Sequence, residues 1–163
     1  MNLKTVLANV KWKKLLICIA IPLAVGGLAA LLTIGSMDAY AKLLQPPFSP
    51  PGWVFPVVWT ILYILMGWAS YRIWTADAPK EKKRDALILY GVQLFFNFFW
   101  SLLFFRWELR LTAFFWLLAL WFLVYATIRL FYRVEDPAGD LLLPYLLWTT
   151  FAAYLNMGVF LLN

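Results

Sequence analysis

Three polar side chains recur every fourth residue within one apolar run: Gln93, Asn97 and Ser101. On a helix this spacing places them on one face. In lipid such groups face the interior of a helix bundle, where they either bond neighbouring helices or contact a ligand. Both roles are open for these three residues. Asn97 lies near the middle of its run, about 16 Å from the inner boundary by helical rise, so it is the best candidate for a ligand contact.

Aromatic residues suggest the rest of a binding site. Trp59 and Tyr63 share a face of one apolar run, and Trp148 and Ala152 share a face of another. Two indoles above the small Ala152 would suit a large, flat, apolar molecule. Helical rise offsets Trp59 from Trp148 by about 10 Å, so one ligand touching both must be large. Tight core packing is the alternative interpretation of the same residues.

No Asp, Glu, Lys or Arg lies in the middle of the apolar runs, and the chain contains no His. An ion-coupled pump or a proton relay would need such a group in its path. A Ser-His-Asp triad and an axial histidine to haem are likewise excluded. Cys18 is the single cysteine, which excludes an intrachain disulfide and a cysteine-based metal site. We expect no resident metal and no cofactor.

The elements that position these residues follow from composition. Hydrophobic residues make up 64% of the 163 residues, and the mean hydropathy is +0.78, more than a soluble domain of this length could bury. Runs of about 20 nearly uncharged residues, each long enough to cross a bilayer, lie at 15–35, 53–74, 86–105, 111–132 and 141–162. They do not alternate as barrel strands do. The sequence predicts an all-α integral membrane protein, a bundle of five transmembrane helices in a single domain, 1–163.

Prolines and small residues punctuate the runs. Pro22, followed by Gly26 and Gly27, predicts a kink and a close helix contact in the first run. Pro56 and Pro144 fall where the first turns of the second and fifth helices are expected. The start of the chain also resembles a cleavable secretory signal, with basic residues, an apolar run and the small-x-small segment Ala39-Tyr40-Ala41. The run is longer than the core of a signal peptide, so we expect the first helix to remain part of the protein.

Basic residues predict the orientation of the bundle. Three of them lie on one side, at Lys42, Arg106 and Arg110, and the other side carries Lys4, Lys11, Lys13, Lys14, Arg72, Lys80, Lys82, Lys83, Arg84, Arg129 and Arg133. The positive-inside rule makes the second side cytoplasmic. The N terminus is then inside, and the C terminus and the first link, 36–52, are outside. The net charge of +6 favours contact with anionic lipid headgroups and not a nucleic-acid partner.

The chain resembles the translocator protein family, also known as tryptophan-rich sensory proteins or peripheral benzodiazepine receptors. Agreement with the family pattern covers the chain from about residue 36 to its end. The matching residues are Tyr40, Leu43, Pro46, Phe48, Pro50, Pro51 and Gly52 in the first link; Phe55, Trp59, Leu62, Tyr63, Met66, Gly67 and Ala69 in the second run; Gln93, Asn97, Trp100, Ser101 and Phe104 in the third; and Leu143, Pro144, Tyr145, Trp148, Phe151, Ala152, Leu155, Asn156 and Asn163 at the end.

This resemblance implies a five-helix bundle, usually a homodimer, that binds protoporphyrin, haem and synthetic benzodiazepine-site drugs in a pocket beneath the first link. Carried over by position, Trp59, Asn97, Trp148 and Ala152 would line the pocket, while Tyr40 and the Pro50 segment would form its lid. The resemblance also implies, for some bacterial relatives, light- and oxygen-dependent degradation of porphyrin that uses residues matching Trp59 and Trp148.

Departures from the family pattern limit which ligands we expect from the resemblance. Phe48 stands where a tryptophan is common, and the cholesterol-recognition segment of animal members has no counterpart after Asn163. Three hypotheses therefore stand: a membrane receptor or carrier for tetrapyrroles, a porphyrin-degrading enzyme, and an assembly partner that packs through small residues such as Gly26 and Ala30. The first is the main prediction, with a role in porphyrin transport or stress sensing and a bacterial inner membrane as the expected site.

Overall fold

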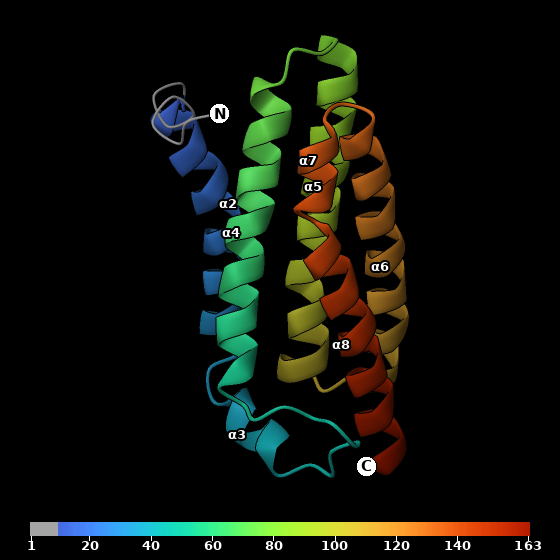
Figure 1. The fold of residues 1–163 in the computed structure, drawn as a ribbon. Coiled ribbons are helices and arrows are strands. Elements are labelled where there is room, and N and C mark those ends of the chain that lie inside the picture. Colours follow the sequence, from blue (N-terminus) through green and yellow to red (C-terminus); the bar gives the residue numbers. More distant parts are fainter. Residues whose placement is uncertain (1–9) are drawn as a thin grey trace.

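Long helices lie side by side in the computed structural model, which describes residues 10–163 (Figure 1). In chain order the elements are α2 (Trp12–Leu32), α3 (Ser36–Ala41), α4 (Val54–Thr75), α5 (Lys80–Ser101), η1 (Leu102–Arg106), α6 (Arg110–Tyr132), α7 (Asp136–Asp140) and α8 (Leu143–Leu162). Within the described residues, five helical segments are long and apolar enough to cross a membrane. The predicted five-helix, all-α membrane fold is confirmed.

Helix boundaries differ from the predicted runs at a few ends. The first helix begins at Trp12 and stops at Leu32, because Gly35 adopts a left-handed φ of +82° before the short helix α3. The third begins at Lys80 and not near residue 86, since its charged first turns continue the helix beyond the apolar run. The fifth predicted run corresponds to α8, and the short helix α7 lies before it in what was expected to be a link. Pro56 and Pro144 lie in the first turns of α4 and α8, as predicted.

A π-helical turn, η1, ends the third membrane-crossing segment. It spans Leu102–Arg106, and the backbone amide of Trp107 donates to the Leu102 carbonyl at 2.9 Å. A wider turn of this kind changes the direction in which the following side chains point. Phe104 and Phe105 lie on this turn, at the end of the bundle where α3 packs.

The helices pack in a definite order. α2 lies against α4, α5 against α6, and α6 against α8, while α5 also contacts α2 and α4 (Figure 1). The contact between α2 and α4 is close enough to need glycine, because a Cβ at Gly67 would lie 2.5 Å from the Cα of Ile19. α7 rests between α4 and α6. Helix α2 therefore lies at the edge of the bundle, against α4 and α5.

Burial is distributed as expected for a protein in lipid. Met66, Ile73, Leu117 and Leu120 are fully buried at the centre of the bundle. The outer faces carry large apolar side chains that are exposed in the isolated chain, among them Leu16, Ile21, Leu31, Phe122, Leu147 and Leu161. A bilayer would cover this outer surface without any further protein.

Charged residues gather at the ends of the helices. The start of α2, the end of α4, the start of α5 and the end of α6 meet at one end of the bundle (Figure 1). These segments carry the described members of the larger basic set; Lys4 lies outside the described residues. At this end Arg72 forms a half-buried ion pair with Glu135, joining α4 to the segment between α6 and α7. The first link and the C terminus lie at the opposite end (Figure 1).

Candidate functional site

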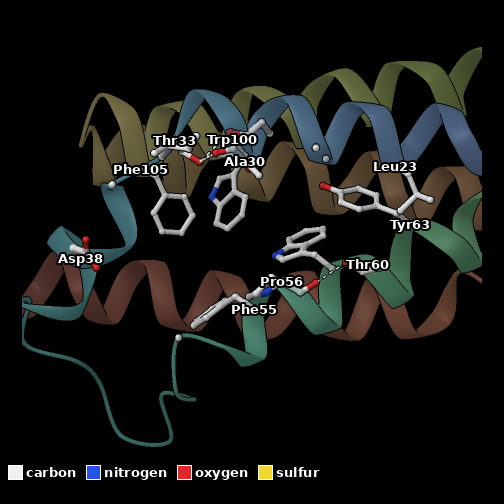
Figure 2. A pocket seen from close by; sticks show the side chains of 18 of the residues that line it. Leu23, Ala30, Thr33, Asp38, Phe55, Pro56, Thr60, Tyr63, Trp100 and Phe105 are labelled. Carbon is white, nitrogen blue, oxygen red and sulfur yellow. Dashed lines mark hydrogen bonds between the residues drawn. The ribbon is translucent and has the colours of Figure 1, made fainter.

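A cavity of about 710 Å³ opens inside the bundle near the first link. It lies between α2 and α4, and the last turn of α5 with η1 forms a third wall (Figure 2). Asp38, Ala41 and Gly52 of the first link border it at the mouth. This volume is within the usual range for small-molecule sites, about 300 to 1,000 Å³.

Small residues on α2 leave the space empty. Gly26, Gly27, Ala29 and Ala30 line the cavity from this helix. Across from Gly26 stands the ring of Tyr63, so close that a Cβ at residue 26 would lie 2.1 Å from the Tyr63 ring. The close helix contact predicted at Gly26 is therefore confirmed. Gly27 faces open space, since a Cβ added at this residue would have no neighbouring atom within 4 Å.

Aromatic rings form the facing walls. Trp59 stacks on Tyr63 with ring centroids 5.5 Å apart and lies 6.0 Å from Trp100 of α5. The Trp100 indole is fixed because its Nε1 donates to Asn156 Oδ1 of α8 at 3.2 Å. Phe55 and Phe105 complete the wall toward the mouth, where Figure 2 shows both rings beside the cavity. The cavity is thus lined by aromatic rings from α4, α5 and η1, and on α2 by small residues flanked by Leu23 and Ile34.

Polar groups around the cavity are few and mostly satisfied. The hydroxyls of Thr33 and Thr60 donate to carbonyls of their own helices, Ala29 O at 2.9 Å and Pro56 O at 2.7 Å. Ser101 adds a third hydroxyl to the lining. Among the described lining residues Asp38 alone is charged, and it lies at the mouth. Apolar stacking, with one acidic group at the entrance, is the chemistry this arrangement offers.

Gln93 and Asn97 form a buried hydrogen-bond chain beyond the cavity wall. The Tyr63 hydroxyl donates to Asn97 Oδ1 at 2.8 Å, and Asn97 Nδ2 donates to the Tyr145 hydroxyl at 3.0 Å. Tyr145 in turn donates to Gln93 Oε1 at 2.9 Å. The chain joins α4, α5 and α8. Of the polar stripe predicted on the third helix, Ser101 borders the cavity, whereas both amides lie in this network and meet the cavity only through Tyr63.

Trp148 and Ala152 lie on the other side of α4 from the cavity. The Trp148 ring contacts Phe55 at 6.1 Å and borders an outer groove between α4 and α8. Ala152 is packed in the core. Trp59 meets α8 through Tyr145, at 6.1 Å. The predicted arrangement of one pocket walled by both indoles and floored by Ala152 is therefore not the geometry seen, because Phe55 and Tyr145 fill the space between them.

The Trp148 indole has an unusual environment. Its Nε1 is buried and finds no hydrogen-bond acceptor within residues 10–163. A buried donor without an acceptor costs about 1 to 3 kcal/mol. Among the described residues, this indole is therefore an unmet hydrogen-bond donor between α4 and α8.

Tyr40 and the first link close the end of the bundle. Tyr40 is buried among Phe55, Phe104 and Phe105, with ring centroids 5.7 to 5.9 Å apart, and this burial raises the pKa of its hydroxyl. Pro50 lies in the same link without lining the cavity, whereas Gly52 does line it. Figure 2 shows the link at the end of the cavity where Asp38 lies, and the role of the link as a lid remains a prediction.

The C-terminal end of α8 holds the link in place. The Asn163 side chain accepts from the Leu44 amide and donates to the Leu44 carbonyl, each at 3.0 Å. Tyr154 donates to the Pro47 carbonyl at 2.9 Å, and Pro46 packs directly on Gly158. These contacts tie the link to α8, a helix that does not itself line the cavity.

Sequence reasoning missed the α2 wall. It took Gly26 and Gly27 only as a packing signal and did not place Ala29, Ala30 or Thr33 at a site. The signal was present, since the second half of this helix is rich in small residues on a face opposite the large aromatic residues of α4. Trp100 and Phe105 were also missed as lining residues. Within residues 10–163, no three His, Cys, Asp or Glu side chains come together.

Fold and site together define a class: a multi-pass helical membrane protein with an aromatic-walled internal cavity beneath a tethered link. Residues 18–162 match the model of the TspO/MBR family, and the chain belongs to this family.

Similar proteins span most of the chain. The tryptophan-rich protein TspO of Chlorobaculum tepidum is 37% identical over 150 residues, covering 91% of this chain and 95% of that protein. The tryptophan-rich sensory protein of Cereibacter sphaeroides is 40% identical over 124 residues, 76% of each chain. The sheep (Ovis aries) translocator protein is 41% identical over 118 residues, 72% of this chain and 70% of that one.

Proposed function

We propose that this protein is a membrane receptor or carrier that binds tetrapyrroles such as protoporphyrin or haem in the cavity between α2 and α4. The observation that carries the proposal is the shape of this cavity. It is about 710 Å³ in volume, with aromatic rings from α4 and from the end of α5 and η1, and with a cluster of Gly and Ala on α2 between the larger Leu23 and Ile34. A flat macrocycle can stack on the rings of such a slot while its opposite face lies against the small residues.

Each lining group has a proposed role. Trp59 and Tyr63 supply the stacking surface, and Ser101 supplies a hydroxyl beside it. Tyr40 and Pro50 belong to the link that closes the mouth. Asn97 and Gln93 act indirectly, because their hydrogen-bond chain fixes the Tyr63 ring.

The edge of the ligand is proposed to face the link. Tetrapyrroles carry carboxylates on one edge, and charged groups are costly in the hydrocarbon core. The mouth is the polar end of the cavity, but Asp38 there would repel a carboxylate. Lys42, exposed four residues further along the same link, supplies the opposite charge. We expect bound propionates to lie toward Lys42 and away from Asp38.

The cellular setting follows the same proposal. The chain is a multi-pass membrane protein, and the basic end of the bundle is proposed to face the cytoplasm, with the first link and the C terminus outside. A bacterial inner membrane is proposed from the strong asymmetry of basic residues, and a homodimer is proposed from the family resemblance. The single transmembrane domain would then carry a ligand site that opens on the outer side.

The two other hypotheses have weaker geometric support. Porphyrin degradation was predicted to use both Trp59 and Trp148, but Trp148 is separated from the cavity by Phe55. An assembly partner was predicted to pack on Gly26 and Ala30. Gly26 packs on Tyr63 of the same chain, and Ala30, although exposed, lines the cavity, so this face offers less to a partner than predicted. Ligand binding is therefore the function that the geometry favours.

The experiment is a titration of the detergent-solubilised protein with protoporphyrin in the dark, followed by the absorbance of the porphyrin. We expect saturable binding that Trp59→Leu weakens by about two- to tenfold, the range for loss of one aromatic contact. Trp68→Leu is the matched control, because Trp68 lies on α4 but faces outward. Binding that does not saturate, or that falls equally in both variants, would overturn the proposal.

Two further arms separate the alternatives. If Trp148→Leu weakens binding as strongly as Trp59→Leu, the ligand lies between α4 and α8 and the proposed cavity is wrong. If light produces a defined porphyrin product that disappears in the double variant Trp59→Phe and Trp148→Phe, degradation is the better description. We expect neither outcome.

A further inference from the structure

A second recess lies on the outer surface, at the basic end of the bundle. It is a groove of about 440 Å³ between the end of α6 and the start of α8. Figure 1 shows these two helices side by side, with α7 leading from one to the other. The groove is far along the helices from the first link and shares no lining residue with the internal cavity.

Two arginines stand on the α6 side of the groove. Arg129 and Arg133 are one helical turn apart, so they project from the same face with their Cα atoms about 6 Å apart along the axis. Both are exposed, and neither forms an ion pair with an acidic side chain in the part of the chain that the structure describes. Glu135, the next acidic residue in the chain, forms an ion pair with Arg72 of α4. The two guanidinium groups are therefore available to an anion.

Apolar side chains make the rest of the groove. Leu143 and Leu146 of α8 face Tyr125 and Ile128 of α6 across it. These residues lie deeper along the bundle than Arg133. A molecule filling the groove would place an anionic group between the arginines and a hydrocarbon chain beside the leucines.

The rim is held rigid by contacts of its own. The Tyr132 hydroxyl donates to Asp140 Oδ1 at 2.7 Å, which ties the end of α6 to α7. Asp136 is the one acidic residue lining the groove. With two arginines and one aspartate, the lining has a net charge of +1, which favours an anion over a neutral or zwitterionic headgroup.

We propose that this groove is a binding site for an anionic phospholipid. The headgroup phosphate lies between Arg129 and Arg133, and one acyl chain lies along Leu143, Leu146 and Tyr125. Basic pockets between transmembrane helices suit anionic headgroups, and arginine matches the geometry of phosphate oxygens. The site would fix the position of α6 against α8 in the membrane.

The test is native mass spectrometry of the full-length protein titrated with phosphatidylglycerol or with phosphatidylcholine of the same acyl chains. We expect the first phosphatidylglycerol to bind more tightly than phosphatidylcholine. The double variant Arg129→Gln and Arg133→Gln should weaken its binding by about ten- to thirtyfold, from the usual contribution of two basic residues at a membrane surface. Lys80→Gln with Lys82→Gln is the control, because it removes the same charge from exposed positions at the same end.

Two more arms test the groove itself. Leu146→Trp keeps both arginines but fills the apolar part, and it should also weaken phosphatidylglycerol binding. Glycerol phosphate, which has the anionic group without acyl chains, should fail to displace the lipid. Equal losses in the arginine and lysine variants, no preference for phosphatidylglycerol, no effect of Leu146→Trp, or full displacement by glycerol phosphate would each overturn the proposal.

Discussion

Helices α8 and α2 meet α4 with side chains of different size. On the side of α8 the aromatic residues of α4 meet Tyr145 and Trp148, and the recess between the two helices is a groove on the outer surface. On the side of α2 they meet Gly26 and Ala30, and a cavity is left. We refer to these as the closed side and the open side of α4. Aromatic residues of α4 face both helices, so in this half of the bundle the size of the partner's side chains decides where a cavity is left.

Tyr63 belongs to both sides. Its ring borders the cavity and packs on Gly26, while its hydroxyl begins the hydrogen-bond chain through Asn97 to Tyr145 and Gln93. Polar bonds between membrane helices are worth about 0.6 kcal/mol on average and up to about 1.7 kcal/mol. The three hydrogen bonds of this chain therefore hold the helices on the closed side in a fixed geometry. The hydrogen-bond chain on the closed side therefore holds the Tyr63 ring, which forms part of the cavity wall on the open side.

Removing Asn97 should have the largest effect on stability. Asn97→Leu leaves the Tyr63 hydroxyl without an acceptor and removes the donor to Tyr145, whose hydroxyl keeps only its bond to Gln93; a buried group left unpaired costs about 1 to 3 kcal/mol. The free energy of unfolding in mixed micelles measures this loss. Tyr63→Phe removes one bond and should cost less than half as much. Equal effects of the two variants would contradict the account of a connected chain.

Filling the contact between α2 and α4 should have the next largest effect. Gly26→Ala forces the Tyr63 ring away, and overpacking of this kind costs about 1 to 3 kcal/mol. Gly27→Ala is a matched control, because its new methyl group would meet open space and change stability by no more than about 1 kcal/mol. Unfolding of both variants in the same micelles gives the comparison. The assignment of α2 to this position would be wrong if Gly27→Ala were the more damaging change.

Untying the link should matter less for stability and more for motion. Asn163→Ala removes two hydrogen bonds to Leu44, each worth about 0.5 to 1.5 kcal/mol before exposure to water is considered. We expect faster hydrogen exchange in residues 42–52 and little change in the transmembrane helices. Tyr125→Phe, a hydroxyl change on the lipid-facing side of α6, serves as the control. Unchanged exchange in the link would show that α8 does not hold it.

Alkaline pH should loosen the same end by a smaller amount. Burial raises the pKa of Tyr40, so the folded link holds this proton more tightly than the unfolded chain does. Its contribution to stability is complete below the ordinary tyrosine pKa of about 10 and is lost as the pH rises through the raised value. The protection factors of residues 36–52, which correct for base-catalysed intrinsic exchange, should therefore fall at alkaline pH, and Tyr40→Phe should remove that fall. An identical pH profile in the variant would exclude Tyr40 as the cause.

Sequence alone predicted the parts of the molecule that depend on one helix at a time. The length and hydropathy of each run located the five spans, and the period of four placed Gln93 and Asn97 in the interior, where both are buried. The positions of Pro56 and Pro144 in first turns followed from the missing amide hydrogen. These features need no knowledge of neighbouring helices.

The relation between helices could not be predicted in this way. Spacing gives the face on which Trp59 and Trp148 lie, but not the rotation that places Phe55 and Tyr145 between them. The π-helical turn at Leu102–Arg106 changes the direction of Phe105, and a regular helix was predicted there. Small residues on α2 gave a packing signal, but only the position of Tyr63 turns that signal into one wall of a cavity.

The most direct test of the account asks whether ligand occupies the open side. Ala30→Phe would fill the cavity from α2, and Leu31→Phe adds a ring on the outer face of the same helix, where Leu31 is 65% exposed. Both proteins would be titrated with protoporphyrin in the dark. If the ligand occupies this cavity, we expect Ala30→Phe to weaken binding about tenfold or more, while Leu31→Phe binds like the unmodified chain. Unchanged binding by Ala30→Phe, or an equal loss in both, would contradict it.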